Sequence, residues 1–554
     1  MPGLNRLMFP NSALIDRLQS ELGQDLLAFL PETILCGAIV LMLVLRLFQL
    51  FNHAHLGWLA LAASVAAFAV AAAQWFGSPG LTPQLSRNPA TELLERQLFT
   101  GLLVYDSFSL FVRVLLFGFL TLTLWLTLLT GIPDRDDSAD FATLLLGGTL
   151  GMVLMASAQH LLMVFLAVEM ASVPSYVLAG FLKGRRKASE AALKYVVYGA
   201  SASGVMLYGI SLLTAKFGTG YLPVIGYGFD THGSNDQFDP IMAVGVLLIL
   251  VGLFFKLAVV PFHFWCPDVF EGAAAEVAAF LSVASKGAAL ALTARFLIAI
   301  TGPSGSYSGV LMSGTLGLGL AFFAAATATV GNLAALGQTN LKRLLAYSTI
   351  AHAGYMLMAL ATLSLAGVGA ALFYLIAYLF MNLGAFAIVA LLRNQTGSEH
   401  LNDYRGMIQR SPLLVITLAI FLLSLLGLPP LAGFVAKFQV FASLFAAGGD
   451  YARHFPHLSY IFYGLLAVAG INTVISAAYY LRVLRVMVLD APPVSGGNTQ
   501  PLKPSRGAAV YALILTGAVV AVGIFWNSLT AASERAANTF KVDTTPPAFR
   551  SKNR

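Results

Sequence analysis

The stretch LLILVGLFFKLAVVPFHFW, residues 247–265, decides what kind of protein this is. Apolar residues dominate it over the length that crosses a bilayer as a helix, about 20 residues. It also carries Lys256, a charge that is costly in lipid, and Pro261, which removes a helical hydrogen bond. The stretch therefore predicts a membrane-spanning helix that contains both a charge and a break.

The composition extends this prediction to the whole chain. Of the 554 residues, 58% are hydrophobic and only 10% are charged, with a mean hydropathy of +0.80. A soluble surface needs far more charge. Because lipid offers no partner for unpaired backbone groups, the spans must be helices, and the alternation typical of barrel strands is absent. We expect an all-α, polytopic membrane protein. The net charge of +7 indicates basic cytoplasmic loops, not a nucleic-acid surface.

About 14 transmembrane helices are expected, each with edges uncertain by several residues. They lie near 26–50, 57–76, 104–130, 142–158, 161–182, 191–215, 241–262, 276–300, 308–336, 344–363, 366–392, 411–446, 459–480 and 507–528. The twelfth is too long for one straight span and contains Pro429 and Pro430. We therefore expect helices 7 and 12 to be discontinuous.

The loops predict the orientation and the organisation of the chain. Odd-numbered connections carry most of the lysines and arginines, which places them in the cytoplasm and both termini outside. The longest connections, 77–103, 216–240 and 481–506, are expected to be ordinary loops, and residues 1–25 are too charged for a cleavable signal.

A weak internal symmetry indicates two inverted five-helix repeats, because an odd number of spans reverses the orientation of the second unit. Each repeat holds a candidate break beside a lysine, Lys256 or Lys437. The expected units are N-terminal helices 1–3, the first repeat, the second repeat, and a last helix with a C-terminal tail. Their ranges are 1–140, 141–300, 301–490 and 491–554.

Five ionisable residues lie within predicted spans, where each costs at least ~2.5–3.5 kcal/mol. They are Glu169, Lys194, Lys256, Lys286 and Lys437. Since burial disfavours the charged form of such groups, together they can form a chain of proton-exchanging sites. Simpler interpretations remain open. Lys194 can reach the headgroups, Lys437 can bind carbonyls freed by the break, and the other three can form a structural ion pair.

Two histidines and two cysteines complete the polar inventory of the spans. His352 shares a helical face with Ser348 and Tyr355, and His263 follows Pro261, so both are candidate proton relays or hydrogen-bonded packing groups. Cys36 and Cys266 are expected to be small buried hydrophobic residues without a disulfide. Arg295, near a span end, is expected to be an interfacial anchor.

The sequence offers no site for a cofactor or a metal. It has no P-loop, no dinucleotide fingerprint after a strand, no cysteine cluster for iron–sulfur and no HExxH motif. We therefore expect no redox centre in this chain, and energy for any uphill transport must come from a partner or an ion gradient.

Four stretches resemble the antiporter-like subunits of respiratory NADH:quinone oxidoreductase (complex I). They are FFKLAVVPFHFWCPDVFEGAAAEVAAFLSVASK (254–286), VEMASVPSYVLAGF (168–181), GNLAALGQTNLKRLLAYSTIAHAGYML (331–357) and GLPPLAGFVAKF (427–438). PDVFEG after FHFW, ASK in span eight and a lysine in span twelve are similar to the branch lettered N, the proton-translocating subunit N of the bacterial enzyme. The chain departs from the family at residues 273–276, AAAE, where proline-rich text is usual, and at Cys266, where a hydroxyl or aliphatic residue is more usual. Glu276 is an additional carboxylate that can tune Lys286 or cap the helix.

The resemblance implies a function and a set of site residues. Glu169 would pair with Lys256 or Lys194, Lys286 would be the central relay, Lys437 the far-side exchange group, and His263 and His352 polar positions of the hydrated axis. FMN, iron–sulfur clusters and quinone would belong to partner subunits of a hetero-oligomer in the bacterial inner membrane. The alternative is a subunit of a multisubunit cation/proton antiporter or an antiporter-linked hydrogenase.

Overall fold

The computed structural model is a helical membrane protein. It describes residues 21–48, 55–83, 85–87, 94–134, 136–233, 239–301, 307–452, 456–492 and 501–540. Within these ranges 14 helices are long and apolar enough to cross a membrane. They coincide with the predicted spans, so the predicted all-α fold with about 14 transmembrane helices is confirmed.

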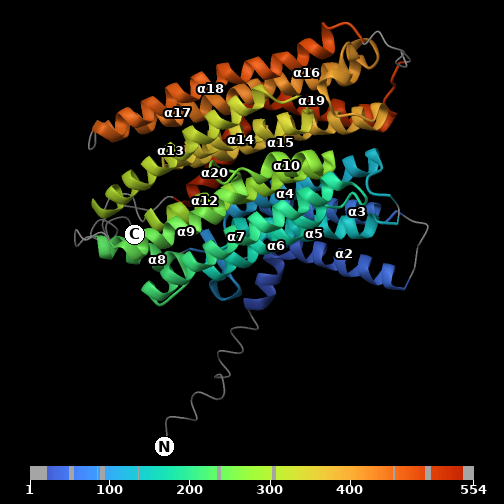
Figure 1. The fold of residues 1–554 in the computed structure, drawn as a ribbon. Helices are drawn as coiled ribbons and strands as arrows, with labels where there is room; N and C mark the ends of the chain where they lie inside the picture. The colour runs from blue at the N-terminus through green and yellow to red at the C-terminus, as the bar shows by residue number, and fades with distance from the viewer. Residues whose placement is uncertain are drawn as a thin grey trace, which may run out of the picture.

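The N-terminal half of the bundle is shown from blue to green in Figure 1. Its helices are α2 (Leu30–Leu47), α3 (Gly57–Trp75), α4 (Ser107–Thr130), α5 (Ser138–Ser157), α6 (Leu161–Ala179), α7 (Arg186–Phe217), α8 (Leu222–Gly233), α9 (Pro240–Leu257), α10 (Trp265–Gly272), α11 (Ala275–Phe280) and α12 (Lys286–Thr301). A π-helix, η3 (Leu281–Ser285), joins α11 to α12 into one apolar segment that is wholly buried.

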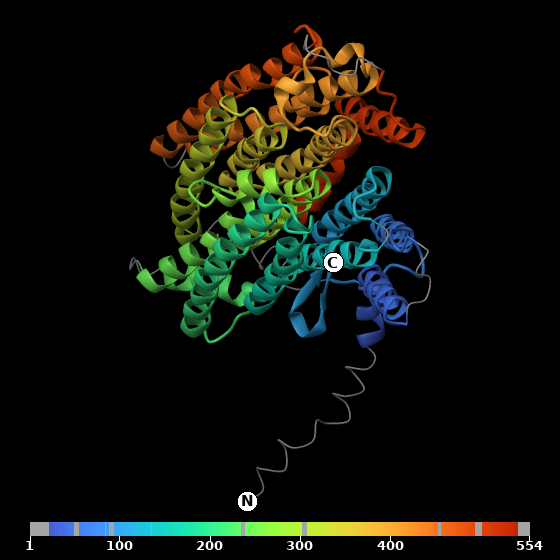
Figure 2. The same cartoon turned by 45° about the vertical axis from the view of Figure 1, so that its right-hand side comes forward.

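The C-terminal half packs against it, as the rotated view in Figure 2 also shows. Its helices are α13 (Tyr307–Leu336), α14 (Leu341–Ala361), α15 (Leu365–Thr396), α16 (Pro412–Leu426), α17 (Ala432–Ala452), α18 (Pro456–Val488), α19 (Arg506–Ile524) and α20 (Trp526–Ala537). Helix α15 lies at the centre of this half, in contact with α14, α16, α17, α19 and α20, and it also touches α4 and α11 of the first half.

Three segments without a predicted span have structure of their own. Strands β1 (Ser86–Arg87), β2 (Leu94–Leu98) and β3 (Leu103–Tyr105) form an antiparallel sheet in the order β1-β2-β3. Helix α8 occupies the connection before α9, and α20 follows the last span and packs against α15 and α4. The prediction of ordinary loops over 77–103 and 216–240 was therefore wrong. These elements are too short and too polar to show the periodicity of a span.

Two helices end near the positions where the sequence predicts breaks, and the discontinuity of spans 7 and 12 stays a prediction. Helix α9 ends at Leu257 and is followed by Ala258 in a left-handed conformation (φ 57°), and the next helix, α10, begins at Trp265. Helix α16 ends at Leu426 and is followed by Gly427 (φ 92°), and α17 begins at Ala432. At the second break a Cβ on Gly433 would overlap the carbonyl oxygen of Ser424, so the two half-helices approach as closely as they do only because this residue is glycine. The inverted repeat relating the two halves stays a prediction.

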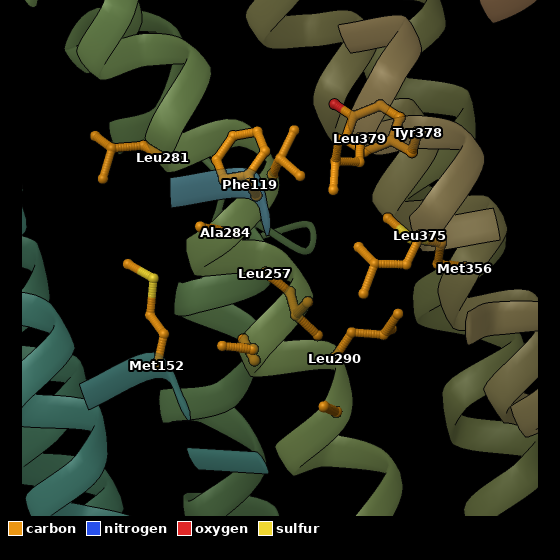
Figure 3. Packing of buried hydrophobic residues seen from close by; sticks show 14 of the residues in the cluster. Phe119, Met152, Leu257, Leu281, Ala284, Leu290, Met356, Leu375, Tyr378 and Leu379 are labelled. Atoms are coloured by element: carbon orange, nitrogen blue, oxygen red, sulfur yellow. The ribbon is translucent and has the colours of Figure 1, made fainter. Parts of the chain in front are cut away.

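Apolar packing encloses the centre of the bundle. Figure 3 shows Leu281, Ala284 and Leu290 of the buried α11–α12 segment in one cluster with Leu375 of α15. A Cβ on Gly287 would lie 2.9 Å from the Leu375 side chain, which shows how closely the two helices pack. Outer helices such as α2 are mostly exposed in the isolated chain. Cys36 lies on that exposed surface, which corrects the prediction that it is buried, while Cys266 is buried, and both are free.

Candidate functional site

Three lysines lie inside the bundle on three different helices. Lys256 is 1% exposed, Lys286 is 0% exposed and Lys437 is 4% exposed. Each of the three amines is therefore enclosed by the protein. Because an isolated buried charge is unfavourable, the groups that surround each amine decide what it can do.

Lys256 is held in the last turn of α9 by aromatic side chains. Its Nζ lies 6.0 Å from the centroid of the Tyr195 ring, and no protein atom hydrogen-bonds to it. Tyr195 stacks on Trp265 at 4.4 Å, and Trp265 Nε1 donates to the Phe255 carbonyl oxygen at 2.9 Å. Trp265 thereby fastens the start of α10 to the end of α9, so the break keeps a fixed shape around the amine.

Glu169 lies near Lys256 but does not form an ion pair with it. The half-buried carboxylate on α6 accepts a hydrogen bond from Ser203 of α7 and acts on Lys256 electrostatically. No contact within 4.0 Å joins the two groups. Glu169 and Lys256 thus interact at a distance and do not form the expected ion pair. In this arrangement the carboxylate can attract charge to the amine without fixing it there.

Lys194 lies apart from this pair. Its Nζ contacts Asp268 Oδ2 at 2.7 Å and Glu190 Oε1 at 2.9 Å, and the side chain is 37% exposed. Arg343 Nη1 contacts the second oxygen of Asp268 at 2.7 Å. Of the two candidate partners for Glu169, Lys256 is therefore the one that the geometry brings near. Lys194 instead joins an ion-pair network near the start of α7.

Lys286 follows directly after the π-helix η3. Such a turn widens the helix locally and is common at functional sites. Its Nζ donates to Cys266 Sγ of α10 at 3.7 Å, and Cys266 is the one group that hydrogen-bonds to this amine among the described residues. His263, in the break between α9 and α10, is within electrostatic range of Lys286, and its Nδ1 has no protein partner.

His352 lies between Lys286 and Lys437 and is influenced by both charges. Its Nδ1 is 2.7 Å from the Tyr374 hydroxyl, and its Nε2 is 3.2 Å from the Tyr480 hydroxyl. The Tyr480 hydroxyl also meets Ser348 Oγ at 2.5 Å. Both ring nitrogens therefore have a hydroxyl partner, and the imidazole can accept a proton on one side while it releases one on the other.

Lys437 lies one turn into α17, after the second break. Its Nζ donates to the carbonyl oxygen of Leu426, the last residue of α16, at 2.8 Å and lies 4.9 Å from the centroid of the Tyr355 ring. The amine thus satisfies a carbonyl that the break frees, as the simpler interpretation supposed. The same contact places a proton-binding group at the end of the buried series.

Two buried ion pairs were missed by the sequence analysis. Arg295 is 6% exposed and grips Asp106 with Nη1 and Nη2 at 2.9 and 3.0 Å, while its Nε donates to the Ala156 carbonyl oxygen at 2.9 Å. The prediction of an interfacial anchor was therefore wrong. Arg113 Nε contacts Glu32 Oε1 at 3.0 Å, with both side chains fully buried. Arg113 lies inside a predicted span, and that was the available signal.

The described residues contain no group of three or more His, Cys, Asp or Glu side chains that could hold a metal ion. The chemistry of the site is instead that of protonatable groups. From α6 to α17 the bundle holds a carboxylate, three amines and an imidazole. They form two electrostatically linked groups, Glu169 with Lys256 and His352 with Lys286 and Lys437.

Comparison with known proteins relates the chain to one family, one curated relative and two solved structures. Residues 158–461 match a family described as the transmembrane NADH:quinone oxidoreductase/Mrp antiporter family. The chain is 41% identical over 462 residues to NADH-quinone oxidoreductase subunit N of Anaeromyxobacter sp. (strain Fw109-5), a match that covers 80% of this chain and 86% of the relative.

Solved structures agree with this match. A chain of respiratory complex I from Thermus thermophilus with bound aureothin is 30% identical, with a TM-score of 0.69 over 90% of this chain and 98% of that one. A chain of the Mrp complex from Dietzia sp. DQ12-45-1b is 20% identical, with a TM-score of 0.76 over 94% of this chain and 97% of that one, and shares the fold.

Proposed function

The chain belongs to the subunit N family of NADH-quinone oxidoreductases, and from this premise we propose that it translocates protons in the membrane arm of such an enzyme. Electron transfer from NADH to quinone would take place in partner subunits that carry FMN, iron–sulfur clusters and the quinone site. The chain itself would work as one subunit of a hetero-oligomer in the bacterial inner membrane.

One observation carries the proposal, namely the unpaired amine of Lys256. Its Nζ is buried without a hydrogen-bond partner and has a carboxylate, Glu169, near it but not in contact. A structural ion pair would close this separation, because an uncompensated buried charge is costly. The open arrangement suits a group that gains and loses a proton as the charge on its neighbour changes.

The other buried groups supply a route away from this pair. A proton that leaves Lys256 would pass to Lys286, then to His352 between its two tyrosine hydroxyls, and then to Lys437 at the second break. His263, beside Lys286 in the first break, would assist the first transfer. Each transfer moves one proton from a protonated group to an unprotonated neighbour, so a redox-driven change at Glu169 would be carried along the series as alternating charge.

The test is the replacement of Lys256 by alanine in the intact enzyme. We expect the complex to assemble and NADH-driven proton pumping to fall at least tenfold, because the variant lacks the amine whose protonation depends on the charge of Glu169. Pumping is measured in inverted membrane vesicles and normalised to the amount of assembled complex. Lys216→Ala is the control, since Lys216 pairs with Asp239 at the far end of α7 and should leave pumping unchanged. Normal pumping by an assembled Lys256→Ala enzyme would refute the role.

A second prediction concerns the hydroxyl partners of His352. Tyr480→Phe removes the group at 3.2 Å from Nε2 and at 2.5 Å from Ser348 without changing the packing of the ring. We expect pumping to slow severalfold with a raised solvent deuterium isotope effect, because proton transfer at His352 becomes limiting. The rate in H₂O and D₂O measures this, and an unchanged isotope effect would mean that the hydroxyl only packs.

The alternative, a cation/proton antiporter subunit, is distinguished by its companions. Affinity purification of the tagged chain from gently solubilised membranes should recover flavin, iron–sulfur and quinone-site subunits. Recovery of small hydrophobic antiporter subunits without a redox protein would instead make Glu169 and Lys256 an ion-exchange site.

A further inference from the structure

Four charged side chains lie together where α11 and α14 begin and α15 ends. Arg393 Nη2 contacts Glu276 Oε1 at 3.2 Å, and Lys342 Nζ contacts Glu399 Oε1 at 2.9 Å. Glu276 is 0% exposed, Lys342 is 3% exposed and the Glu399 side chain is 15% exposed. The cluster therefore runs from a partly exposed carboxylate to a fully buried one.

Lys342 connects the two ion pairs. Its Nζ also donates to the Ala273 carbonyl oxygen at 2.6 Å, directly before α11, and it is influenced by the charges of Glu276 and Arg393 as well as Glu399. By the distribution of loop charges, this end of the bundle is the cytoplasmic one. The charged groups that face Glu276 are thus Arg393 from α15, Lys342 from α14 and, beyond Lys342, Glu399.

Polar side chains continue from Glu276 toward Lys286 on the same helical segment. Asn382 of α15 donates to Ser282 Oγ at 2.5 Å, and both residues are fully buried. Asn382 Oδ1 has no protein hydrogen-bond partner, and the Ser285 hydroxyl neighbours the Tyr195 hydroxyl without a well-formed hydrogen bond. Buried polar atoms that lack a protein partner are typical positions for ordered water, which conducts protons over such gaps. Ser282 lies six residues after Glu276 and four residues before Lys286, within the π-helix η3.

A purely structural ion pair explains only part of this arrangement. Glu276 in the first turn of α11 is favourable to the helix dipole, and Arg393 neutralises it. Neither effect accounts for the unsatisfied Oδ1 of Asn382 on α15, whose side chain meets Ser282 between Glu276 and Lys286. A buried polar atom without a partner is costly unless water satisfies it.

We propose that Glu399, Lys342 and Glu276 form the cytoplasmic proton inlet that feeds Lys286. This inference rests on the proposed proton-translocating function and names a residue, Glu276, that the translocation series does not include. A proton taken up at Glu399 passes by way of Lys342 to the Glu276 carboxylate, which releases it through water beside Ser282 and Ser285 to the Lys286 amine. At each step one O–H or N–H bond breaks as the next forms.

The test removes the carboxylate together with its buried counter-ion. Glu276→Gln/Arg393→Gln leaves no uncompensated charge, so the intact complex should assemble. NADH-driven pumping is measured in inverted vesicles, whose outer face is the cytoplasmic one, at external pH 6.5 and 8.5. We expect a change within twofold at pH 6.5 and at least a fivefold loss at pH 8.5, where free protons are scarce and the carboxylate must collect them. The single variant Glu276→Asp, which keeps a carboxylate next to Arg393, should pump at close to the wild-type rate at pH 8.5.

The matched control is Glu32→Gln/Arg113→Gln, which removes another fully buried carboxylate–arginine pair away from the series. Its effect should not depend on the external pH. An inlet variant whose loss is the same at both pH values, or absent at both, overturns the inlet. If Lys256→Ala also pumps normally, the proposed function fails as well. If Lys256→Ala is impaired and the inlet variant is not, the proposed inlet is refuted and the proposed function stands.

Discussion

Replacement of Lys286 by methionine should reduce NADH-driven proton pumping to the background of vesicles without the enzyme. Methionine fills a similar volume and removes the charge, so packing in the fully buried α11–α12 segment is kept. The amine is the group nearest Cys266 and the link between the first break and His352. Among the described residues, the series has no other amine or imidazole between the first break and His352. Loss of Lys286 therefore interrupts the proposed proton path at its centre.

The assay should separate pumping from assembly. NADH oxidation by membranes in the presence of an uncoupler, together with the amount of intact complex on a native gel, reports whether the enzyme is present. Lys286→Arg provides a second variant, because it retains a charge but cannot release its proton. We expect Lys286→Arg to pump no better than Lys286→Met. Recovery of pumping by arginine would show that the site needs a fixed positive charge, which would contradict the relay role.

Replacement of Asp106 by alanine should be the most damaging change for the stability of the fold. It leaves the Arg295 guanidinium buried with only the Ala156 carbonyl oxygen and two aromatic rings as partners. Loss of one partner from a buried pair costs about 3–5 kcal/mol. Asp106 also caps α4 by accepting from the Ser109 backbone N–H at 2.7 Å, and loss of such a cap adds about 1 kcal/mol.

The amount of folded chain in detergent after heating measures this effect. A matched comparison is Asp106→Asn, which keeps the cap but not the charge and should be less damaging than alanine. The double variant Asp106→Asn/Arg295→Met removes the orphaned guanidinium and should recover part of the loss. Equal thermal stability of Asp106→Ala and the wild-type chain would mean that the pair contributes nothing.

Much of the fold could be predicted from the chain itself, because a membrane imposes simple rules. The length of apolar runs predicted the spans, and proline and glycine lie close to the helix ends at Leu257 and Leu426. Deep lysines were recognisable because charge inside a span is costly wherever the span lies. These features depend only on local sequence, and local sequence was sufficient for them.

Features that depend on which helices become neighbours could not be predicted. Arg295 and Asp106 are 189 residues apart, and nothing local indicates that they meet. The same holds for Glu276 with Arg393. The separation of Glu169 from Lys256 depends on the distance between α6 and α9, and the π-helix before Lys286 depends on packing against α15. Lys194 is a lysine like the three buried ones, yet it lies near the start of α7, where its partners Glu190 and Asp268 are partly exposed.

The position of α20 has a consequence for how the chain matures. This last described helix lies against α15 and α4, and the Phe540 ring that follows it covers both Phe108, at 4.9 Å, and the Arg295 guanidinium. Ribosomes deliver α4 early and Phe540 late. The contacts of α20 and Phe540 with α4 and Arg295 can therefore form only after α20 has been synthesised, long after α4. A nascent chain that stalls before α20 lacks this cover over the Asp106–Arg295 pair.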